Sequence, residues 1–473
     1  MKKVIISSFA ILSVMSCRTD FDTKVEDVKP TSGEANFSNY VALGNSLTSG
    51  YRDGALYRDG QIESYPNIIA QQMKLAGGGD FTQPLMQDNI GGFVGIPNFD
   101  AKLELKLVNG SLTPVRLTTE KNLDKLTGLF NNMGVPGAKS FHLVTPGYGS
   151  SAGNPYFMRF ASSTTTTVLA DAIAKKPTFF SLWIGNNDVL SYATSGGTGT
   201  NQTGNSNPRT YGSNDITDPQ VLAGSIKAIL DGMKSAGATK GVLANIPNVV
   251  DIPFFTTVPS KPISGITETQ VSELNTAYSQ YNFALQRVKS LGLINEAEYQ
   301  QRLISFNNNG ANGAVIVDKD LTNLSSHGIP SYRQTTSKDY ILLPTLSQLR
   351  SGGGTKTPLT DEQVLTEKET AKVLTATQAY NASIKALADS YGLAFVDANA
   401  KMAELAKNTG LIYNGVNYTT SFVTGGAFSL DGVHLTGRGY GIIANEFIKA
   451  INNKYGSTLP QVNPNKYSGV KFP

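Results

Sequence analysis

The chain reads YVALGNSLT over residues 40–48, a short apolar run that leads into a turn carrying Ser46. The run from Tyr40 to Leu43 predicts a buried strand that ends at Gly44. A serine at the carboxyl end of a parallel strand points into the crevice where open α/β sheets bind ligands. A turn serine on its own more often has a structural role. The function of Ser46 therefore depends on the rest of the chain.

Similar apolar runs recur along the chain and alternate with segments of helical spacing. Strands are predicted at Tyr40 to Leu43, Thr178 to Ile184, Gly241 to Ala244 and Leu393 to Val396, and helices at Pro66 to Leu75, Thr167 to Lys175, Pro219 to Ser235 and Gly437 to Ile451. Such alternation is typical of a parallel sheet with helices on both faces. We therefore expect an α/β fold, a flavodoxin-like three-layer sandwich around a parallel central sheet.

Several segments exceed this minimal plan. Runs from Lys102 to Val108 and from Leu112 to Leu117 flank Asn109-Gly110, which predicts an inserted β-hairpin. The polar stretch from Ser195 to Asp215 predicts a long loop. The largest excess runs from Pro253 to about Leu374, and we expect it to form a cap over the site. Within it we predict a helix at Glu268 to Ser290, short strands at Ala314 to Val317 and Tyr340 to Leu343, and a break at Gly352 to Gly354.

The predicted helix from Glu268 to Ser290 has apolar residues at helical spacing: Val271, Leu274, Ala277, Tyr278 and Tyr281. We interpret them first as a packing face and only second as a lipid-binding surface.

The overall composition indicates a globular protein with a nearly balanced charge. The 473 residues are 40% hydrophobic and 16% charged, which is enough to bury a sizeable core. The chain has 40 lysine and arginine residues and 36 acidic residues. Lys2 and Lys3 belong to the N-terminal export signal described below, and without them 38 basic residues remain. An excess this small gives no reason to expect nucleic acid as a partner.

The N-terminus has the pattern of an export signal. Lys2 and Lys3 precede an apolar run from Val4 to Met15 that is too short to span a bilayer. The only cysteine, Cys17, follows in VMSC, which resembles the bacterial lipobox. We expect residues 1–16 to be removed and residues 17–36 to form a lipidated tether to the bacterial cell envelope, with the outer membrane as the favoured address. A soluble signal with an incidental cysteine is the alternative.

A second polar block, Asp431-Gly432-Val433-His434, lies just before the last predicted helix. A carboxylate three residues before a histidine can hold one ring nitrogen and leave the other free to take a proton from a serine. The other two histidines, His142 and His327, have no such partner nearby in the sequence. We expect structural or surface roles for them.

Two further turns could stabilise negative charge. GNND at residues 185–188 ends a predicted strand and supplies side-chain amides, while Gly137 in VPGA at residues 135–138 offers an unobstructed backbone N–H. Either turn alone would most often be structural. Ser, Gly, Asn and His together, each at a predicted strand end or loop, are hard to obtain by chance.

In this order the four blocks resemble those of the GDSL or SGNH hydrolases. The resemblance implies that Ser46 is the nucleophile, that Asp431 and His434 complete a triad, and that Ser46, Gly137 and Asn187 form the oxyanion hole. It also implies a hydrolase domain over residues 37–473, with an insertion at about 253–374. The chain departs from the family at Asn45, where the family has Asp, and in the long segment between Asn187 and Asp431.

The implied activity is hydrolysis of carboxylic esters by a serine esterase, without a metal or an organic cofactor. An acylated glycan or a lipid would suit as substrate, with the membrane reached through the anchor at Cys17. The alternative is a non-catalytic surface lipoprotein that binds glycans through exposed aromatic residues. Trp183, the only tryptophan, lies in a strand that we expect to be buried, so it gives the alternative little support.

A rival nucleophile motif lies at residues 149–153, where GSSAG fits the pattern G-x-S-x-G around Ser151. That motif needs a strand immediately before it and a helix immediately after it. Here Pro146 and Gly147 precede the motif and Pro155 follows it. We expect a loop, and Ser151 is a distant second to Ser46.

Overall fold

A computed structural model describes residues 29–473. The predicted export signal, Cys17 and the first part of the predicted tether lie outside these residues. Within residues 29–473, no helix combines the length and apolar character needed to cross a membrane.

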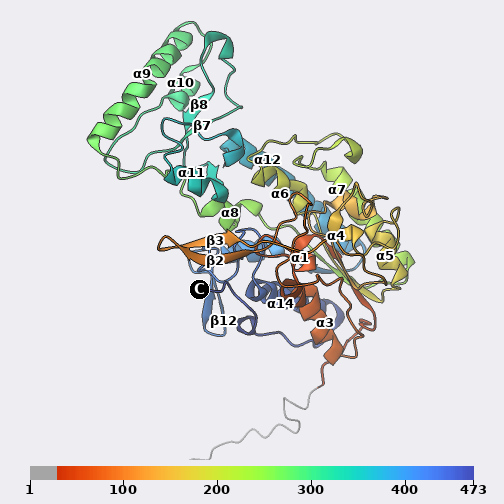
Figure 1. The fold of residues 1–473 in the computed structure, drawn as a ribbon. Helices are drawn as coiled ribbons and strands as arrows, with labels where there is room; N and C mark the ends of the chain where they lie inside the picture. Colours follow the sequence, from red (N-terminus) through yellow and green to blue (C-terminus); the bar gives the residue numbers. More distant parts are fainter. Residues whose placement is uncertain (1–28) are drawn as a thin grey trace, which may run out of the picture.

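A five-stranded parallel sheet forms the centre of the protein (Figure 1). Its strands lie in the order β4-β1-β5-β6-β11, which is the flavodoxin-like order 2-1-3-4-5 when they are numbered along the chain. The predicted fold class is therefore confirmed. The strands are β1 (Tyr40–Gly44), β4 (Asn132–Gly134), β5 (Phe179–Trp183), β6 (Gly241–Ala244) and β11 (Ala394–Val396).

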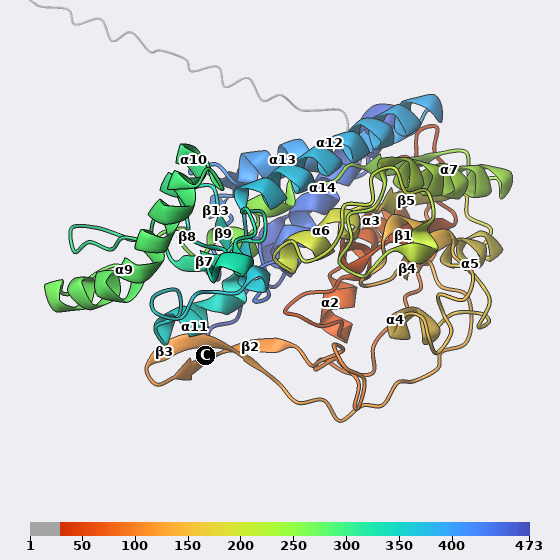
Figure 2. The ribbon, with the colours of Figure 1, turned by 90° about the horizontal axis from the view of Figure 1, so that it is seen from above.

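Helices cover both faces of the sheet, which gives three layers (Figures 1 and 2). Side chains alternate across each strand, so that in β1 Val41 and Leu43 pack into one apolar core while Tyr40 and Ala42 pack into the other. The first core is shared with α5 (Val168–Ala174), α7 (Pro219–Ser235) and α12 (Glu367–Ser390), and the second with α3 (Tyr65–Leu75) and α14 (Gly437–Tyr455).

Helix α12 was not predicted, and it changes the boundary of the insertion. It starts with a capping box, in which Thr366 and Glu369 satisfy each other's backbone N–H groups. Its residues Val373 and Tyr380 are fully buried in the core beside the sheet. The predicted end of the insertion at about Leu374 therefore falls inside a helix that belongs to the three-layer body.

The predicted hairpin is present as β2 (Leu103–Val108) and β3 (Ser111–Arg116), which pair antiparallel. Asn109 and Gly110 connect them with φ angles of 50° and 78°. Positive φ at both central residues is required by the type I′ turn, which is common in two-residue hairpin loops. The stretch from Ser195 to Asp215 is a loop with one short 3-10 turn, η3 (Pro208–Thr210).

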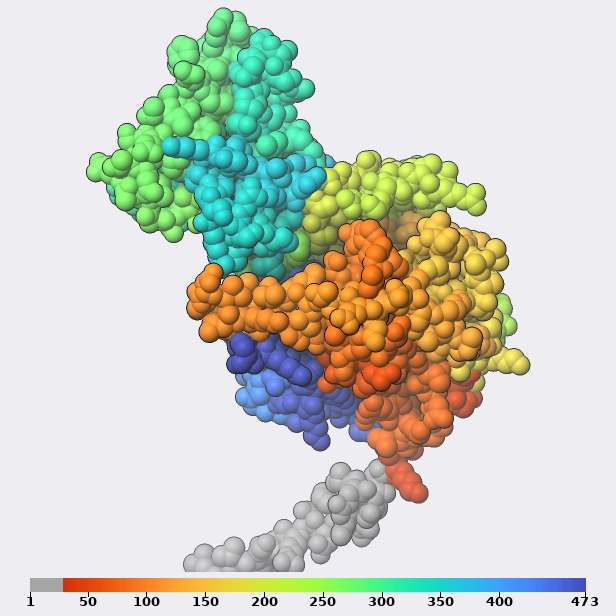
Figure 3. All heavy atoms as spheres, viewed as in Figure 1, coloured from red at the N-terminus to blue at the C-terminus, as the bar shows by residue number. Residues whose placement is uncertain are grey.

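The long segment after β6 has an inner and an outer part. The inner part, residues 253–258 and 340–345, includes α8 (Pro253–Thr256) and β9 (Tyr340–Ile341), and Val258 pairs with Ile341. The outer lobe, residues 259–339, projects from the body together with residues that follow it in the chain (Figure 3). Leu359 and Val364 pack against its Ala314 and Ile316. The elements of the outer lobe are α9 (Glu268–Ser290), α10 (Glu296–Arg302), β7 (Val315–Val317) and β8 (Tyr332–Gln334).

Helix α9 packs inside the outer lobe. Leu274 and Tyr278 are buried there against Ile304, Phe306 and Val315. The expected packing face is therefore present. Ala277, which we assigned to that face, is exposed.

Candidate active site

The first block forms a tight turn at the carboxyl end of β1. Helix α1 (Ser46–Ser49) begins one residue after the strand, so Ser46 lies at the carboxyl edge of the sheet. In the sheet, β1 has β4 on one side and β5 on the other. A Cβ on Gly44 would lie 2.1 Å from Thr48 Oγ1 and 2.4 Å from the Trp183 carbonyl oxygen. Glycine is therefore needed here. The strand order reverses between the neighbouring strands β1 and β5, and ligands bind at this point in this fold class.

Ser46, His434 and Asp431 form a continuous row of hydrogen bonds. The distance from Ser46 Oγ to His434 Nε2 is 2.9 Å, and that from His434 Nδ1 to Asp431 Oδ2 is also 2.9 Å. The two contacts use opposite nitrogens of one imidazole ring. Chemically, this arrangement can remove the proton of the Ser46 hydroxyl and stabilise the imidazolium that results.

The Asp431 carboxylate accepts hydrogen bonds on both oxygens. Its Oδ1 accepts from the backbone N–H groups of Val433 and His434, at 2.9 and 2.8 Å, and from Ser429 Oγ at 3.1 Å. Its Oδ2 also accepts from the Gly54 N–H at 2.8 Å. Burial alone would raise the pKa of Asp431, but His434 and the backbone donors outweigh it and hold that pKa well below its usual range. The carboxylate therefore stays ionised around neutral pH.

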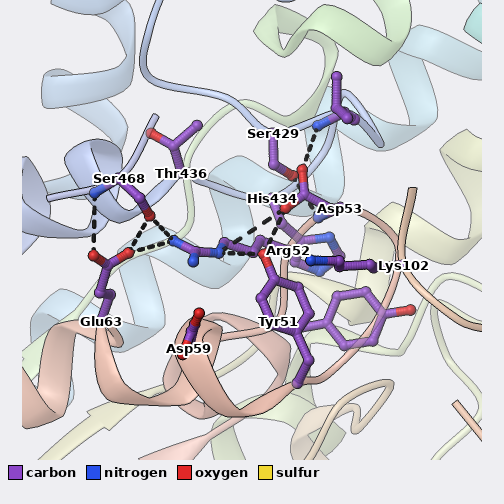
Figure 4. Close-up of polar contacts among 12 residues, drawn as sticks. Tyr51, Arg52, Asp53, Asp59, Glu63, Lys102, Ser429, His434, Thr436 and Ser468 are labelled. Carbon is purple, nitrogen blue, oxygen red and sulfur yellow. Dashed lines mark hydrogen bonds and ion pairs between the residues drawn. The ribbon is translucent and has the colours of Figure 1, made fainter. Parts of the chain in front are cut away.

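A second chain segment supports the turn that carries Asp431, and Figure 4 shows Asp53 of this segment next to Ser429 of the turn. Asp53 Oδ1 accepts from the Leu430 N–H at 3.0 Å, and the Asp53 N–H donates to Ser429 Oγ at 2.9 Å. The Tyr57 hydroxyl donates to Asp53 Oδ2 at 2.6 Å. Burial raises the pKa of Asp53 against the opposing effect of these donors. Sequence reasoning missed Asp53 because nothing near it in the chain indicates a partner at residues 429–431.

Arg52 ties this supporting segment to two other parts of the chain. Its Nε donates to the Tyr57 hydroxyl at 2.6 Å, and its Nη1 lies 2.6 Å from Glu63 Oε2 and 2.8 Å from Ser468 Oγ. Ser468 also hydrogen-bonds Glu63 through its backbone and side chain. The segment behind the triad is therefore held by a connected polar network, visible in Figure 4.

Gly137 and Asn187 belong to the turns that follow β4 and β5, the two strands that flank β1. Gly137 follows β4 with φ of 80°, and the Val135 N–H just before it donates to the Gly44 carbonyl at 3.0 Å. Asn187 Nδ2 donates one hydrogen to the Ala138 carbonyl at 2.9 Å. Within residues 29–473, the backbone N–H groups of Ser46 and Gly137 donate to no protein group. These N–H groups and the second amide hydrogen can serve an oxyanion.

Asp188 connects the two turns that carry these donors. Its carboxylate accepts from the Ser140 N–H at 2.8 Å and from Ser140 Oγ at 2.7 Å. Burial raises the pKa of Asp188, whereas the Ser140 donors lower it. Asp188 was not predicted as a site residue, although it ends the GNND block. It fixes the turn after β5 relative to the turn after β4.

Asn45 connects the first block to the GNND block. Its Oδ1 accepts from the Leu47 N–H at 3.0 Å, and its Nδ2 donates to Asn186 Oδ1 at 3.2 Å. An amide at this position therefore has a partner for each of its two groups. The departure from Asp at residue 45 leaves the turn around Ser46 hydrogen-bonded.

The rival motif lacks the context that a nucleophile elbow needs. Residues 149–153 form a turn without a preceding strand, and Ser151 is exposed. The short helix α4 (Pro155–Met158) begins only after Asn154. Among residues 29–473, no cluster of three or more His, Cys, Asp or Glu side chains is suited to hold a metal ion.

The other two histidines lie apart from the triad. His142 stacks on Tyr148 with 4.5 Å between ring centroids, and its Nδ1 accepts from the Lys139 N–H at 3.0 Å. Burial and the Lys139 ammonium lower the pKa of His142 to about 4. His327 is exposed in the outer lobe.

Comparison with known proteins finds loose structural neighbours. No protein-family model matches the chain, and no curated protein matches it. An acetylxylan esterase from Geobacillus stearothermophilus aligns at 11% identity with a TM-score of 0.33, over 88% of this chain and 95% of its own. A GDSL-like lipase from Parabacteroides merdae aligns at 11% identity with a TM-score of 0.33, over 89% of this chain and 99% of its own. An extracellular lipase from Streptomyces rimosus aligns at 12% identity with a TM-score of 0.31, over 88% of this chain and 99% of its own.

The similarity of this chain to a known family is therefore judged from its own residues. The four blocks follow β1, β4 and β5 and precede α14, and their order along the chain is that of the GDSL family pattern. By its sequence blocks and by the parallel sheet that carries them, the chain is similar to the GDSL/SGNH hydrolases.

Proposed function

We propose that the protein is a serine esterase that cleaves carboxylic esters through an acyl-enzyme intermediate. The observation that carries the proposal is the row Ser46 Oγ, His434 and Asp431, with 2.9 Å at each step. Ser46 Oγ attacks the ester carbonyl while His434 Nε2 takes the hydroxyl proton. His434 then gives this proton to the leaving alcohol, and a water molecule attacks the acyl-enzyme in the same way.

Three donors would stabilise the oxyanion of the tetrahedral intermediate in this proposal. They are the backbone N–H groups of Ser46 and Gly137 and the free hydrogen of the Asn187 amide. Donors of this kind are worth roughly 3 kcal/mol each when they are fixed before the reaction. The Asp188 to Ser140 contact supplies that rigidity, because it holds the turns of Asn187 and Gly137 together.

The substrate class that we propose is an ester of a glycan or a lipid at the bacterial cell envelope. The anchor at Cys17, which lies outside the described residues, would bring the enzyme to that location. The alternative of a glycan-binding protein without activity predicts no ester turnover at all.

The decisive experiment compares the purified wild type with Ser46→Ala on p-nitrophenyl acetate. We expect the variant to lose turnover and to keep its melting temperature, because the Ser46 hydroxyl adds little packing. Ser151→Ala serves as the matched control and should behave like the wild type. Turnover in Ser46→Ala, or its loss in Ser151→Ala alone, would remove Ser46 as the nucleophile.

A further inference from the structure

An apolar cavity opens beside the proposed nucleophile. Ser46, His434 and Asn187 lie on its wall. Much of the remaining wall comes from α13 (Ala398–Leu405) and α14. The apolar side chains on this part of its wall include Met402, Leu405, Leu411, Phe428, Ile442 and Ile443.

Polar groups are confined almost entirely to one end of this cavity. Asn45, Ser46, Asn186, Asn187 and His434 gather at the proposed catalytic end. The remaining wall has a single charged side chain, that of Lys401, which is engaged by Glu404 at 2.6 Å and Glu446 at 3.6 Å. A ligand that fits this wall therefore has one polar end and an apolar remainder.

We propose that this cavity binds the acyl chain of the substrate, and that the natural substrate is an ester of a medium- or long-chain fatty acid. The assignment of the polar end rests on the proposed function, since it requires the ester carbonyl to lie at Ser46. The acyl chain then extends toward Met402 and Leu405. The sugar ring of a glycan would leave its hydroxyl groups without partners against this wall, which is unfavourable. An acetyl group would leave most of the wall without contacts.

The first test is a chain-length series of p-nitrophenyl esters at concentrations below micelle formation. Each buried methylene can add a factor of roughly four to transition-state binding. We expect kcat/KM for the octanoate to exceed that for the acetate by about tenfold or more. A preference for acetate over octanoate in an active enzyme would overturn the proposal.

Two variants localise the effect to the cavity. Met402 is buried in the wall, and Met402→Gln keeps its volume but adds an amide without a partner. Leu411→Gln makes the corresponding change at a half-exposed wall position. Each should lower the ratio of kcat/KM for the octanoate to that for the acetate by about tenfold. Ala403→Gln is the control, because Ala403 lies on the exposed side of the same helix.

A binding measurement separates this inference from the proposed function. Trp183 is the only tryptophan of the chain and lies on the cavity wall, so its fluorescence reports directly on occupancy. Decanoic acid brominated on its chain should quench Trp183 saturably in the wild type and in Ser46→Ala. The same fatty acid should bind more weakly to Met402→Gln and normally to Ala403→Gln.

The outcomes of the two measurements differ for the two ideas. Saturable quenching without any ester turnover would overturn the esterase proposal and leave an apolar ligand site. Ester turnover with no quenching and no dependence on chain length would leave the esterase and overturn the acyl site. Equal losses in Met402→Gln and Ala403→Gln would also contradict the assignment of the cavity.

Discussion

The backbone N–H of Gly54 donates to Asp431 Oδ2 at 2.8 Å across a separation of 377 residues in the chain. This is the same carboxylate oxygen that lies 2.9 Å from His434 Nδ1. The segment after β1 thus supplies the candidate nucleophile and also holds the carboxylate that orients the candidate base. Movement of the Asp53-Gly54 turn would affect both ends of the triad.

Asp53 should therefore act as a positioning residue for Asp431. Asn tolerates the left-handed backbone of residue 53, where φ is 54°. Asp53→Asn replaces one carboxylate oxygen by an NH2 group, so the side chain can no longer accept from both the Tyr57 hydroxyl and the Leu430 N–H. We expect kcat on p-nitrophenyl butyrate to fall roughly tenfold with little change in KM, because a small misplacement of the triad acts on the chemical step. Asp59→Asn is the control, since Asp59 is exposed. A rise in KM with unchanged kcat would contradict this role.

The stability of the protein should depend on pH through His142. The pKa of His142 is lowered to about 4 in the folded state by burial and by Lys139. In the unfolded chain His142 takes up a proton near pH 6.5, whereas in the folded protein it stays neutral down to about pH 4. The stability that neutral His142 contributes is therefore fully present above pH 6.5 and is lost as the pH falls toward 4. The free energy of unfolding should decrease by up to about 3 kcal/mol over this window.

His142→Asn removes the titrating group and retains an acceptor for the Lys139 N–H. Its absolute stability should be lower, because the stacking on Tyr148 is lost. Urea unfolding from pH 7 to pH 4 should nevertheless give a flatter curve for the variant than for the wild type. Parallel curves for the two proteins would show that His142 does not titrate in this window.

The parts of the fold that could be predicted are those with strong local patterns. Strands β1, β5, β6 and β11 lie in the apolar runs that the sequence displays. Strand β4 was missed because its three residues, NMG, include the polar Asn132 and carry no periodicity. Helix α12 was missed although its capping box, Thr366 with Glu369, is visible in the sequence, because its apolar positions are interleaved with many polar residues.

The candidate site divides in the same way. Ser46, Asp431, His434, Gly137 and Asn187 lie in short blocks whose residue types suggest their chemistry. The contacts from Asp53 and Gly54 depend on tertiary packing between segments distant in the chain. No local pattern encodes such contacts, so only the structure could reveal them.

Lipidation at Cys17 stays a prediction from the sequence alone. Cells fed a labelled fatty acid should incorporate it into the wild type and not into Cys17→Ser, and the wild type should partition with membranes. Two or more acyl chains are needed for stable anchoring, so the variant should be released or remain unprocessed. An unlipidated, soluble mature protein in wild-type cells would contradict the anchor.

The last prediction concerns the outer lobe. Ile263 and Asn312 form an antiparallel bridge, with N–H to carbonyl distances of 3.2 and 2.7 Å. A two-residue glycine-containing turn can therefore replace residues 264–311, which include α9 and α10. None of the residues that line the apolar cavity lies in this range. We expect the shortened protein to keep its acyl chain-length preference and to hydrolyse p-nitrophenyl acetate within about threefold of the wild type. If the lobe is a cap, kcat/KM for esters of bulky alcohols should change by about tenfold or more.

Phe254→Ala provides the contrast for the inner part of the same segment. The Phe254 N–H donates to the Gly432 carbonyl at 2.9 Å, and a Cβ on Gly432 would lie 2.9 Å from Leu343 and 3.1 Å from the Phe254 nitrogen. The turn between Asp431 and His434 thus packs closely on the inner part. The Phe254 ring packs against Phe255 and the core, so its loss should loosen α8 beside this turn and lower kcat on all esters alike. Circular dichroism and thermal melting must show that both variants are folded. Equal losses on small and bulky esters in a folded lobe deletion would mean that the lobe supports the catalytic site, and the cap interpretation would be wrong.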